Sequence, residues 1–105
     1  MHSINKSYNL LIKTMPITHL VIPSVESRYS TAYIANVFHK LNIGRVSSVT
    51  LNMYSHKYNT AHITIDEWYD TESAYSIIKK LKDETRETRL VHNSNDDWWV
   101  IRIDK

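Results

Sequence analysis

Hydrophobic and polar residues alternate most regularly over residues 61–65, which read Ala-His-Ile-Thr-Ile. A period of two is typical of a β-strand that buries one of its faces. We predict a strand over residues 60–65, with Ile63 directed at a core and Thr60 and His62 on the opposite face. Because that opposite face stays available to a ligand, its residues decide what the sheet can bind.

Similar patterns predict the other elements of the chain. Apolar residues alternate with polar ones in several further segments, and they recur at helical spacing in two. The predicted strands cover residues 17–22, 49–54, 60–65, 88–92 and 98–103, and the predicted helices cover residues 31–41 and 71–82.

Turn-forming and capping residues set the predicted boundaries. Pro23 has no amide hydrogen for a strand ladder and is expected to end the first strand. Ser30 or Thr31 is expected to cap the first helix, and Gly44 is expected to stop the helical run of apolar residues. Asp70 is expected to cap the second helix.

The order of these elements predicts an α+β fold. Strand, helix, strand, strand, helix and strand make the ferredoxin-like arrangement, in which a four-stranded antiparallel sheet carries both helices on one face. The C-terminal hairpin is expected to add one strand to this sheet. Residues 16–105 are expected to form this domain, and residues 1–15 an N-terminal extension whose apolar cluster around Leu10 docks on the open sheet face or on a partner subunit.

Two segments and two aromatic pairs carry a family resemblance over residues 17–103. Residues 20–25, Leu-Val-Ile-Pro-Ser-Val, and residues 58–65, Tyr-Asn-Thr-Ala-His-Ile-Thr-Ile, lie where the RNA recognition motif (RRM) has its two strand motifs. Trp68-Tyr69 follows the third strand, and Trp98-Trp99 lies in the last. This layout resembles the small RRM-like proteins of large DNA viruses. The resemblance implies a sheet face that binds single-stranded RNA.

The chain departs from that family on the sheet face itself. Val21, Thr60 and His62 stand where the family stacks bases on aromatic rings. Such stacking is worth about 1–3 kcal/mol per base, so we expect weak binding. Tyr54 and Trp98, on opposite edge strands, are expected to supply stacking surfaces instead. The predicted nucleic-acid-binding residues are Tyr54, Thr60, His62, Trp98, Arg102, His19, Arg45 and Lys57.

Other aromatic and basic residues are expected to have structural roles. Trp99 is predicted in the core, and Trp68 and Tyr69 are predicted to pack at the entry of the second helix. The lysines of that helix, Lys79, Lys80 and Lys82, lie beside Asp83 and Glu84 and are expected to be solvated, and Arg86, Glu87 and Arg89 are expected to form a mixed-charge loop.

Six histidines raise the question of catalysis or metal binding. His62 and Thr64 fit the His-x-Thr pattern of two-histidine phosphoesterases, but His19 does not begin a second copy. His19 and His62 are expected on adjacent strands, without a carboxylate on that face to complete a ligand set. The remaining histidines, His92 among them, are expected at the surface. We predict no enzyme, no metal and no cofactor.

Length, charge and composition narrow the setting. The chain has 105 residues, enough for one core, and its formal charge of +2 is weak evidence for a polyanionic partner. The lack of cysteine favours a reducing compartment. The longest apolar run near the N-terminus is too short to span a membrane. We therefore expect an intracellular protein, in the cytoplasm or nucleus of a host, or a virion component.

Two functions remain open from the sequence. The first is weak binding of single-stranded nucleic acid, RNA above all, through the sheet face. The second is a protein-interaction or structural module that uses the same fold to pair with another subunit, a second copy of this chain being one candidate.

Overall fold

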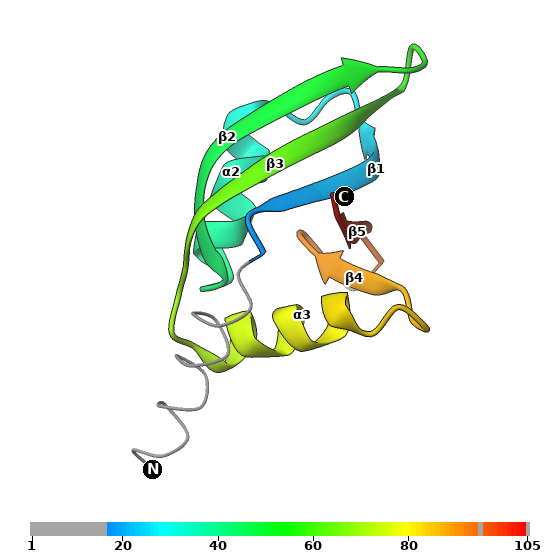
Figure 1. The fold of residues 1–105 in the computed structure, drawn as a ribbon. Helices are drawn as coiled ribbons and strands as arrows, with labels where there is room; N and C mark the ends of the chain where they lie inside the picture. The colour runs from blue at the N-terminus through cyan, green and yellow to red at the C-terminus, as the bar shows by residue number, and fades with distance from the viewer. Residues whose placement is uncertain (1–16, 95, 105) are drawn as a thin grey trace.

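A computed structural model describes residues 17–94 and 96–104, so the predicted N-terminal extension lies outside the described residues. The elements, in chain order, are β1 (His19–Glu26), α2 (Thr31–Lys40), β2 (Gly44–Met53), β3 (Tyr58–Trp68), α3 (Glu72–Lys82), β4 (Thr88–Val91) and β5 (Trp98–Ile103) (Figure 1). Neither helix is long and apolar enough to span a membrane.

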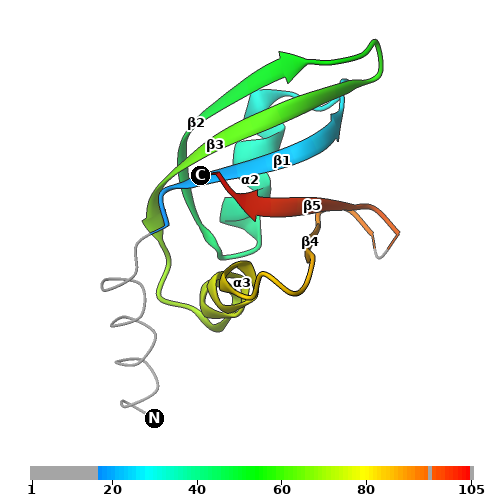
Figure 2. The same ribbon diagram turned by 45° about the vertical axis from the view of Figure 1, so that its right-hand side comes forward.

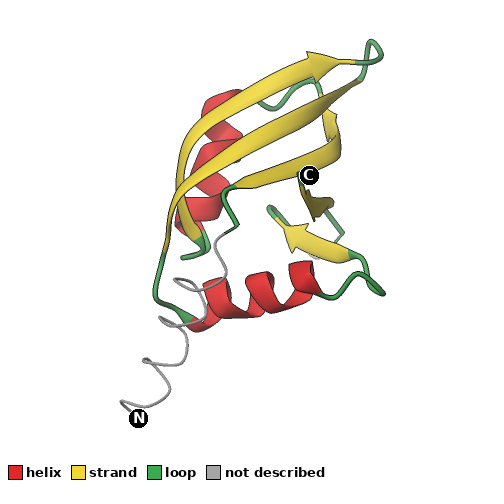
Figure 3. Ribbon diagram, in the orientation of Figure 1, coloured by secondary structure: helices red, strands yellow, loops and turns green. Residues whose placement is uncertain are grey.

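The strands form a five-stranded antiparallel sheet in the order β2-β3-β1-β5-β4 (Figure 3). The predicted α+β class is confirmed, and the arrangement is compatible with a ferredoxin-like fold. It differs from a four-stranded RRM sheet because β4 lies outside β5. The prediction that Trp98 lies on an edge strand is therefore wrong, since β5 has a neighbour on each side.

Both helices contribute to one core beneath the sheet. Phe38 of α2 and Ile78 of α3 belong to the same buried cluster as Leu20, Ile63 and Ile101 of the strands. The sheet face that carries these strand residues is thus the covered face. Figure 2 shows the opposite side of β2, β3, β1 and β5 with neither helix in front of it. We call this opposite side the open face.

Helix caps follow local chemistry, with one correction. The Ser30 hydroxyl accepts a hydrogen bond from the Tyr33 amide at 3.0 Å, which confirms the serine as the cap of α2. The cap of α3 is Thr71, not Asp70 as predicted. The Thr71 hydroxyl accepts a hydrogen bond from the Ala74 amide at 3.0 Å. It also donates to the Asn42 carbonyl at 2.6 Å, which links the start of α3 to the loop between α2 and β2.

The first strand runs past Pro23, although the proline was expected to end it. The register between β1 and β3 shifts between Ile22 and Val25, so the proline lies in an irregular stretch where no amide is needed. The Thr60 hydroxyl donates to the Pro23 carbonyl at 3.1 Å. This side-chain bond joins β3 to the irregular stretch of β1.

The middle strands are longer than predicted. β2 begins at Gly44, five residues before the predicted start at Val49, and β3 extends to Trp68. Trp68 therefore ends β3, shortly before α3 begins at Glu72. Its indole N–H donates to the Ile17 carbonyl at 2.6 Å, a partner that only the folded chain brings near.

Candidate functional site

The register of the strands confirms the predicted faces. Thr50, His62, Val21 and Arg102 face one another in a row across β2, β3, β1 and β5. The neighbours of His62 along β3, Ala61 and Ile63, are buried. Because side chains alternate along a strand, this row lies on the open face.

Exposed aromatic side chains gather at one end of the open face. Tyr54 is 57% exposed, Tyr58 39% and Trp98 38%. They lie where β2 ends and where β3 and β5 begin, and the antiparallel pairing brings these three strand ends together. We call Tyr54, Tyr58 and Trp98 the aromatic end. Exposed rings of this kind offer flat apolar surface to a planar ligand.

A hollow opens between β1 and β5 at the aromatic end. The two strands pair only at Leu20–Ile103 and Val21–Arg102, so the first residues of β5 have no partner on the β1 side. The hollow has a volume of about 380 Å³. Its lining consists of Pro23, Ser24, Glu26, Tyr58, Asp97, Trp98, Trp99, Val100 and Arg102.

Contacts within the aromatic end hold its rings in place. The Tyr54 and Tyr58 rings are nearly parallel, with centroids 6.2 Å apart. The Tyr54 hydroxyl lies 2.7 Å from the Ser24 hydroxyl, on the rim of the hollow. On the other side, the Arg89 guanidinium lies over the Trp98 ring at 4.2 Å from its centroid, in a cation–π contact.

The middle of the open face is polar, and its groups are engaged with one another. His62 Nδ1 lies 2.9 Å from an Asp104 carboxylate oxygen, and His19 Nδ1 lies 2.9 Å from the Thr18 hydroxyl. Asp104 thus brings a carboxylate next to one of the two histidines. Even so, the described residues contain no group of three or more His, Cys, Asp or Glu side chains placed to hold a metal ion.

The predicted binding residues do not all meet. Trp98 and Arg102 line the hollow, Tyr54 contacts its rim, and Lys57 lies in the turn before Tyr58. Thr60, His62 and His19 lie on the open face and make the side-chain contacts given above.

Arg45 lies at the opposite end of the sheet. Its guanidinium contacts Asp66 at 2.6 Å and Glu67 at 3.8 Å. The Asp66 hydrogen bond and charge raise the pKa of Arg45. Arg45 is thus part of a surface ion-pair group and is remote from the hollow.

Two residues of this region were missed from the sequence. Tyr58 has the same parity as Thr60 and His62, so extending the alternation by two residues would have placed it on the open face. Arg89 alternates with the buried Leu90 in the predicted strand 88–92, and the same argument applies to it.

His92 is buried, although it was expected at the surface. Its side chain is 0% exposed, and its ring stacks on Trp99 with centroids 3.9 Å apart. Nδ1 lies 3.0 Å from the Tyr33 hydroxyl and Nε2 lies 3.0 Å from Asp97, without a well-aligned hydrogen bond at Nε2. Burial lowers the pKa of His92 more than the Asp97 charge raises it. The contacts of His92 with Trp99, Tyr33 and Asp97 stabilise the β4–β5 hairpin next to the hollow.

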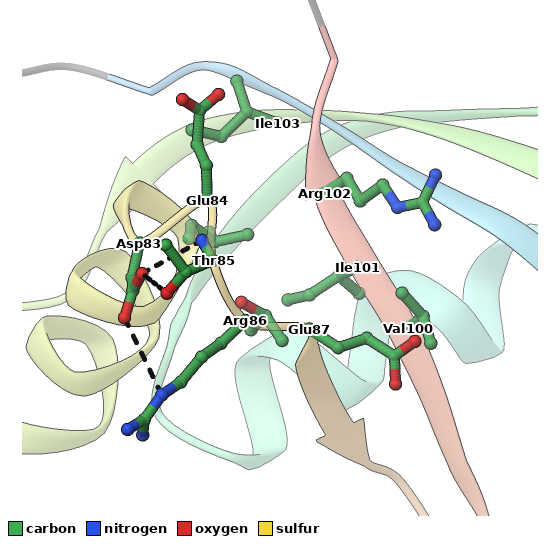
Figure 4. A pocket seen from close by; sticks show the side chains of 11 residues that line it. Asp83, Glu84, Thr85, Arg86, Glu87, Val100, Ile101, Arg102 and Ile103 are labelled. Carbon is green, nitrogen blue, oxygen red and sulfur yellow. Dashed lines mark hydrogen bonds and ion pairs between the residues drawn. The ribbon is translucent and has the colours of Figure 1, made fainter.

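A second hollow lies between the α3–β4 loop and β5 (Figure 4). Its charged lining is mixed, with Asp83, Glu84 and Glu87 against Arg86 and Arg102. Asp83 is held by the Thr85 hydroxyl and amide and by an ion pair with Arg86. The lining of this second hollow contains no aromatic ring, and its three acids are largely offset by two arginines, so we do not assign a ligand to it.

The chain was also compared with known proteins. The chain matches no protein-family model, and no significant match was found among curated proteins or among solved structures.

Proposed function

We propose that this protein is a binding module for single-stranded nucleic acid, RNA above all, and that the bases stack at the aromatic end of the open face. The observation that carries the proposal is the hollow between β1 and β5, which has the half-exposed rings of Tyr58 and Trp98 in its lining. An unstacked base has two apolar faces and a polar edge. A hollow with aromatic walls and Arg102 in its lining suits those surfaces.

The rings suffice for modest affinity. Stacking is worth about 1–3 kcal/mol per base, so Tyr58 and Trp98 together supply about 2–6 kcal/mol. The acids Glu26 and Asp97 also line the hollow and repel phosphates. One carboxylate oxygen of Asp97 already accepts hydrogen bonds from Tyr29 and Asn93. We therefore expect weak binding in which the bases enter the hollow and the phosphates stay outside it.

The proposal differs from the RRM resemblance in where the bases lie. That family stacks bases along the middle of its sheet, whereas here the middle carries Val21, Thr60 and His62. The aromatic end supplies the missing rings from other positions. An RRM-like role thus depends on this displaced platform.

The test is a binding titration with a fluorescein-labelled oligouridine of about ten nucleotides, followed by anisotropy. Replacing Tyr58 and Trp98 together by Ala should weaken binding by at least about 2 kcal/mol, which is roughly 30-fold. Replacing both by Phe keeps the rings and should retain most of the affinity. Equal losses in the two variants would rule out stacking. A DNA strand of equal length shows whether the 2′-hydroxyl matters.

The alternative is a protein-interaction surface at the same place. Val91, which is 41% exposed and pairs with Trp98 in the β4–β5 ladder, lies beside the aromatic end and extends its apolar area. Exposed apolar area of this kind is also typical of protein interfaces. If it serves a second copy of this chain, sedimentation of the isolated protein should show concentration-dependent dimers that the double Ala variant does not form.

A further inference from the structure

Among the described residues, positive charge is concentrated in one groove on the outside of α3 and the start of β4. The groove has a volume of about 800 Å³. Its lining consists of Ser76, Lys79, Lys80, Lys82, Asp83, Arg86, Glu87 and Arg89. Among the described residues, the groove holds five of the ten Lys and Arg residues but only two of the 11 Asp and Glu residues, which leaves five cations and nine acids outside it. The groove is therefore net positive, whereas the rest of the described residues are net negative.

The acids in the groove are already paired. Asp83 contacts Arg86 at 4.0 Å, and Glu87 contacts Arg89 at 3.2 Å. Among the described residues, the ion pairs leave Lys79, Lys80 and Lys82 without a partner. An anion entering the groove therefore meets three uncompensated ammonium groups.

The dipole of α3 accounts for only part of this arrangement. Lysines in the last turn of a helix favour its negative end. Arg86 and Arg89, however, come from the loop and strand that follow, outside the helix. Figure 4 shows the Arg86 side chain pointing away from β5. Arg102 points the opposite way, away from the α3–β4 loop, and does not line the groove. The fold thus adds two arginines to the helix lysines.

Arg89 connects the groove to the aromatic end. It lines the groove, and its guanidinium covers the Trp98 ring at 4.2 Å. Because β4 is an edge strand, no further strand separates the two surfaces on that side of the described sheet. When a base of a single-stranded nucleic acid stacks on Trp98, the next phosphates of that nucleic acid lie near Arg89. The lysines of α3 lie beyond Arg89 along the same path.

We propose that this groove binds the phosphates of the same single-stranded nucleic acid whose bases stack at the aromatic end. This inference rests on the proposed function, and it adds a path for the backbone from Trp98 around the edge of β4 to the outer face of α3. Each cation that neutralises a phosphate releases a counterion. The binding constant then falls with salt by a slope of about 0.7 per cation in a logarithmic plot for single strands.

The experiment measures that slope with the labelled oligouridine between about 50 and 200 mM salt. Replacing Lys79, Lys80 and Lys82 together by Ala should lower the slope by about 2, so that salt weakens the variant roughly 20-fold less than the wild type over this range. Lys80→Ala alone should lower it by about 0.7. The matched control is Lys40→Ala, which removes an exposed lysine from the last turn of α2 and should leave the slope unchanged.

The outcomes separate the two proposals. Binding that quenches tryptophan fluorescence, combined with an unchanged slope in the triple variant, overturns the groove while the aromatic end stands. Equal effects of Lys40→Ala and Lys80→Ala also overturn it, because the charge would then act from any surface. Absence of binding by the wild type at about 50 mM salt overturns the proposed function and the groove together.

Discussion

Gly44 lies where the neighbouring strand leaves no room for a side chain. A side-chain carbon at this position would lie 2.7 Å from the Glu67 backbone oxygen on the neighbouring strand β3. That atom is backbone and cannot rotate away, so any larger residue must push two paired strands apart. The absence of a side chain is therefore what allows β2 to begin here.

Replacing Gly44 by Ala should lower the free energy of unfolding by about 1–3 kcal/mol, the usual cost of forcing extra atoms into a packed site. Urea denaturation measures the change. The control is Asn52→Ala, at an exposed position of the same strand, which should change stability by about 0.5 kcal/mol or less. A Gly44→Ala variant as stable as the control would show that β3 can yield at this point.

Alternation along a strand predicts which way a residue points, but not what it bonds. It placed Thr60 and His62 on the open face, and the register confirms this. The Thr60 hydroxyl is engaged by the Pro23 carbonyl and the His62 ring by Asp104, and both partners come from distant parts of the chain. Tyr58 was missed because the polar Asn59 interrupts the inward apolar series before Ala61.

At the scale of elements, the β4–β5 hairpin is held together by contacts of the buried His92 in its loop. The His92 amide donates to the Asp97 carbonyl at 3.1 Å, and the His92 ring stacks on Trp99 of β5. The sequence places a histidine among turn-forming residues, which favours an exposed loop. Burial follows from the Tyr29 and Tyr33 rings of the α2 region, which lie against the imidazole in the folded chain.

His92 should make stability fall as pH decreases below about 6.5, the ordinary pKa of histidine. Burial lowers the pKa of His92 in the folded protein, and the charge of Arg28 acts in the same direction. The nearby carboxylates of Asp97 and Glu26 raise this pKa, but by less. The unfolded chain therefore takes up the proton first, and stability is lost between the ordinary pKa and the lower folded one. The slope for one proton is at most about 1.4 kcal/mol per pH unit.

Urea denaturation between about pH 7.5 and pH 5.5 tests this dependence. His92→Gln removes the titrating ring, so the stability of the variant should decrease less than that of the wild type over this range. His56→Gln, in the exposed β2–β3 turn, is the control and should keep the wild-type dependence. Parallel curves for the wild type and His92→Gln would contradict the assignment to His92.

Element boundaries were harder to predict than element types. The helices and all five strands were found, but β1 passes through Pro23 and β3 reaches Trp68. Both errors arise from tertiary partners. The irregular register of β1 needs no amide at Pro23, so the proline does not end the strand. The Ile17 carbonyl accepts a hydrogen bond from the Trp68 indole N–H, and this tertiary contact favours a longer β3.

For the whole molecule, the sheet order creates surfaces that the linear charge pattern hides. In the sequence, Lys79 to Lys82 are interpreted as a solvated helix face beside Asp83 and Glu84, and Arg86 to Arg89 as a mixed-charge loop, and neither suggests a site. The placement of β4 at the sheet edge brings them to one groove and brings Arg89 onto Trp98. The class of fold could be predicted from the sequence, whereas this juxtaposition required the position of the added strand.

The shared core also means that the described part of the chain should unfold as one unit. Ile63 is 1% exposed and pairs with Leu20 of β1 and Val49 of β2, within the cluster that includes Phe38 and Ile78 of the two helices. Replacing Ile63 by Ala should therefore cost about 2–5 kcal/mol, the usual range for truncating a buried isoleucine. Far-ultraviolet and near-ultraviolet circular dichroism, which follow the backbone and the tryptophans, should report the same shifted denaturation midpoint.

The control for this prediction is Thr50→Ala, at an exposed open-face position of β2, which should change stability by less than about 1 kcal/mol, the span of β-propensity. Two separate transitions in the Ile63→Ala variant would mean that α3 and the hairpin form a core of their own. A loss below about 1 kcal/mol would place Ile63 outside the core. The strand register would then be shifted by one residue, and His62 would no longer lie on the open face.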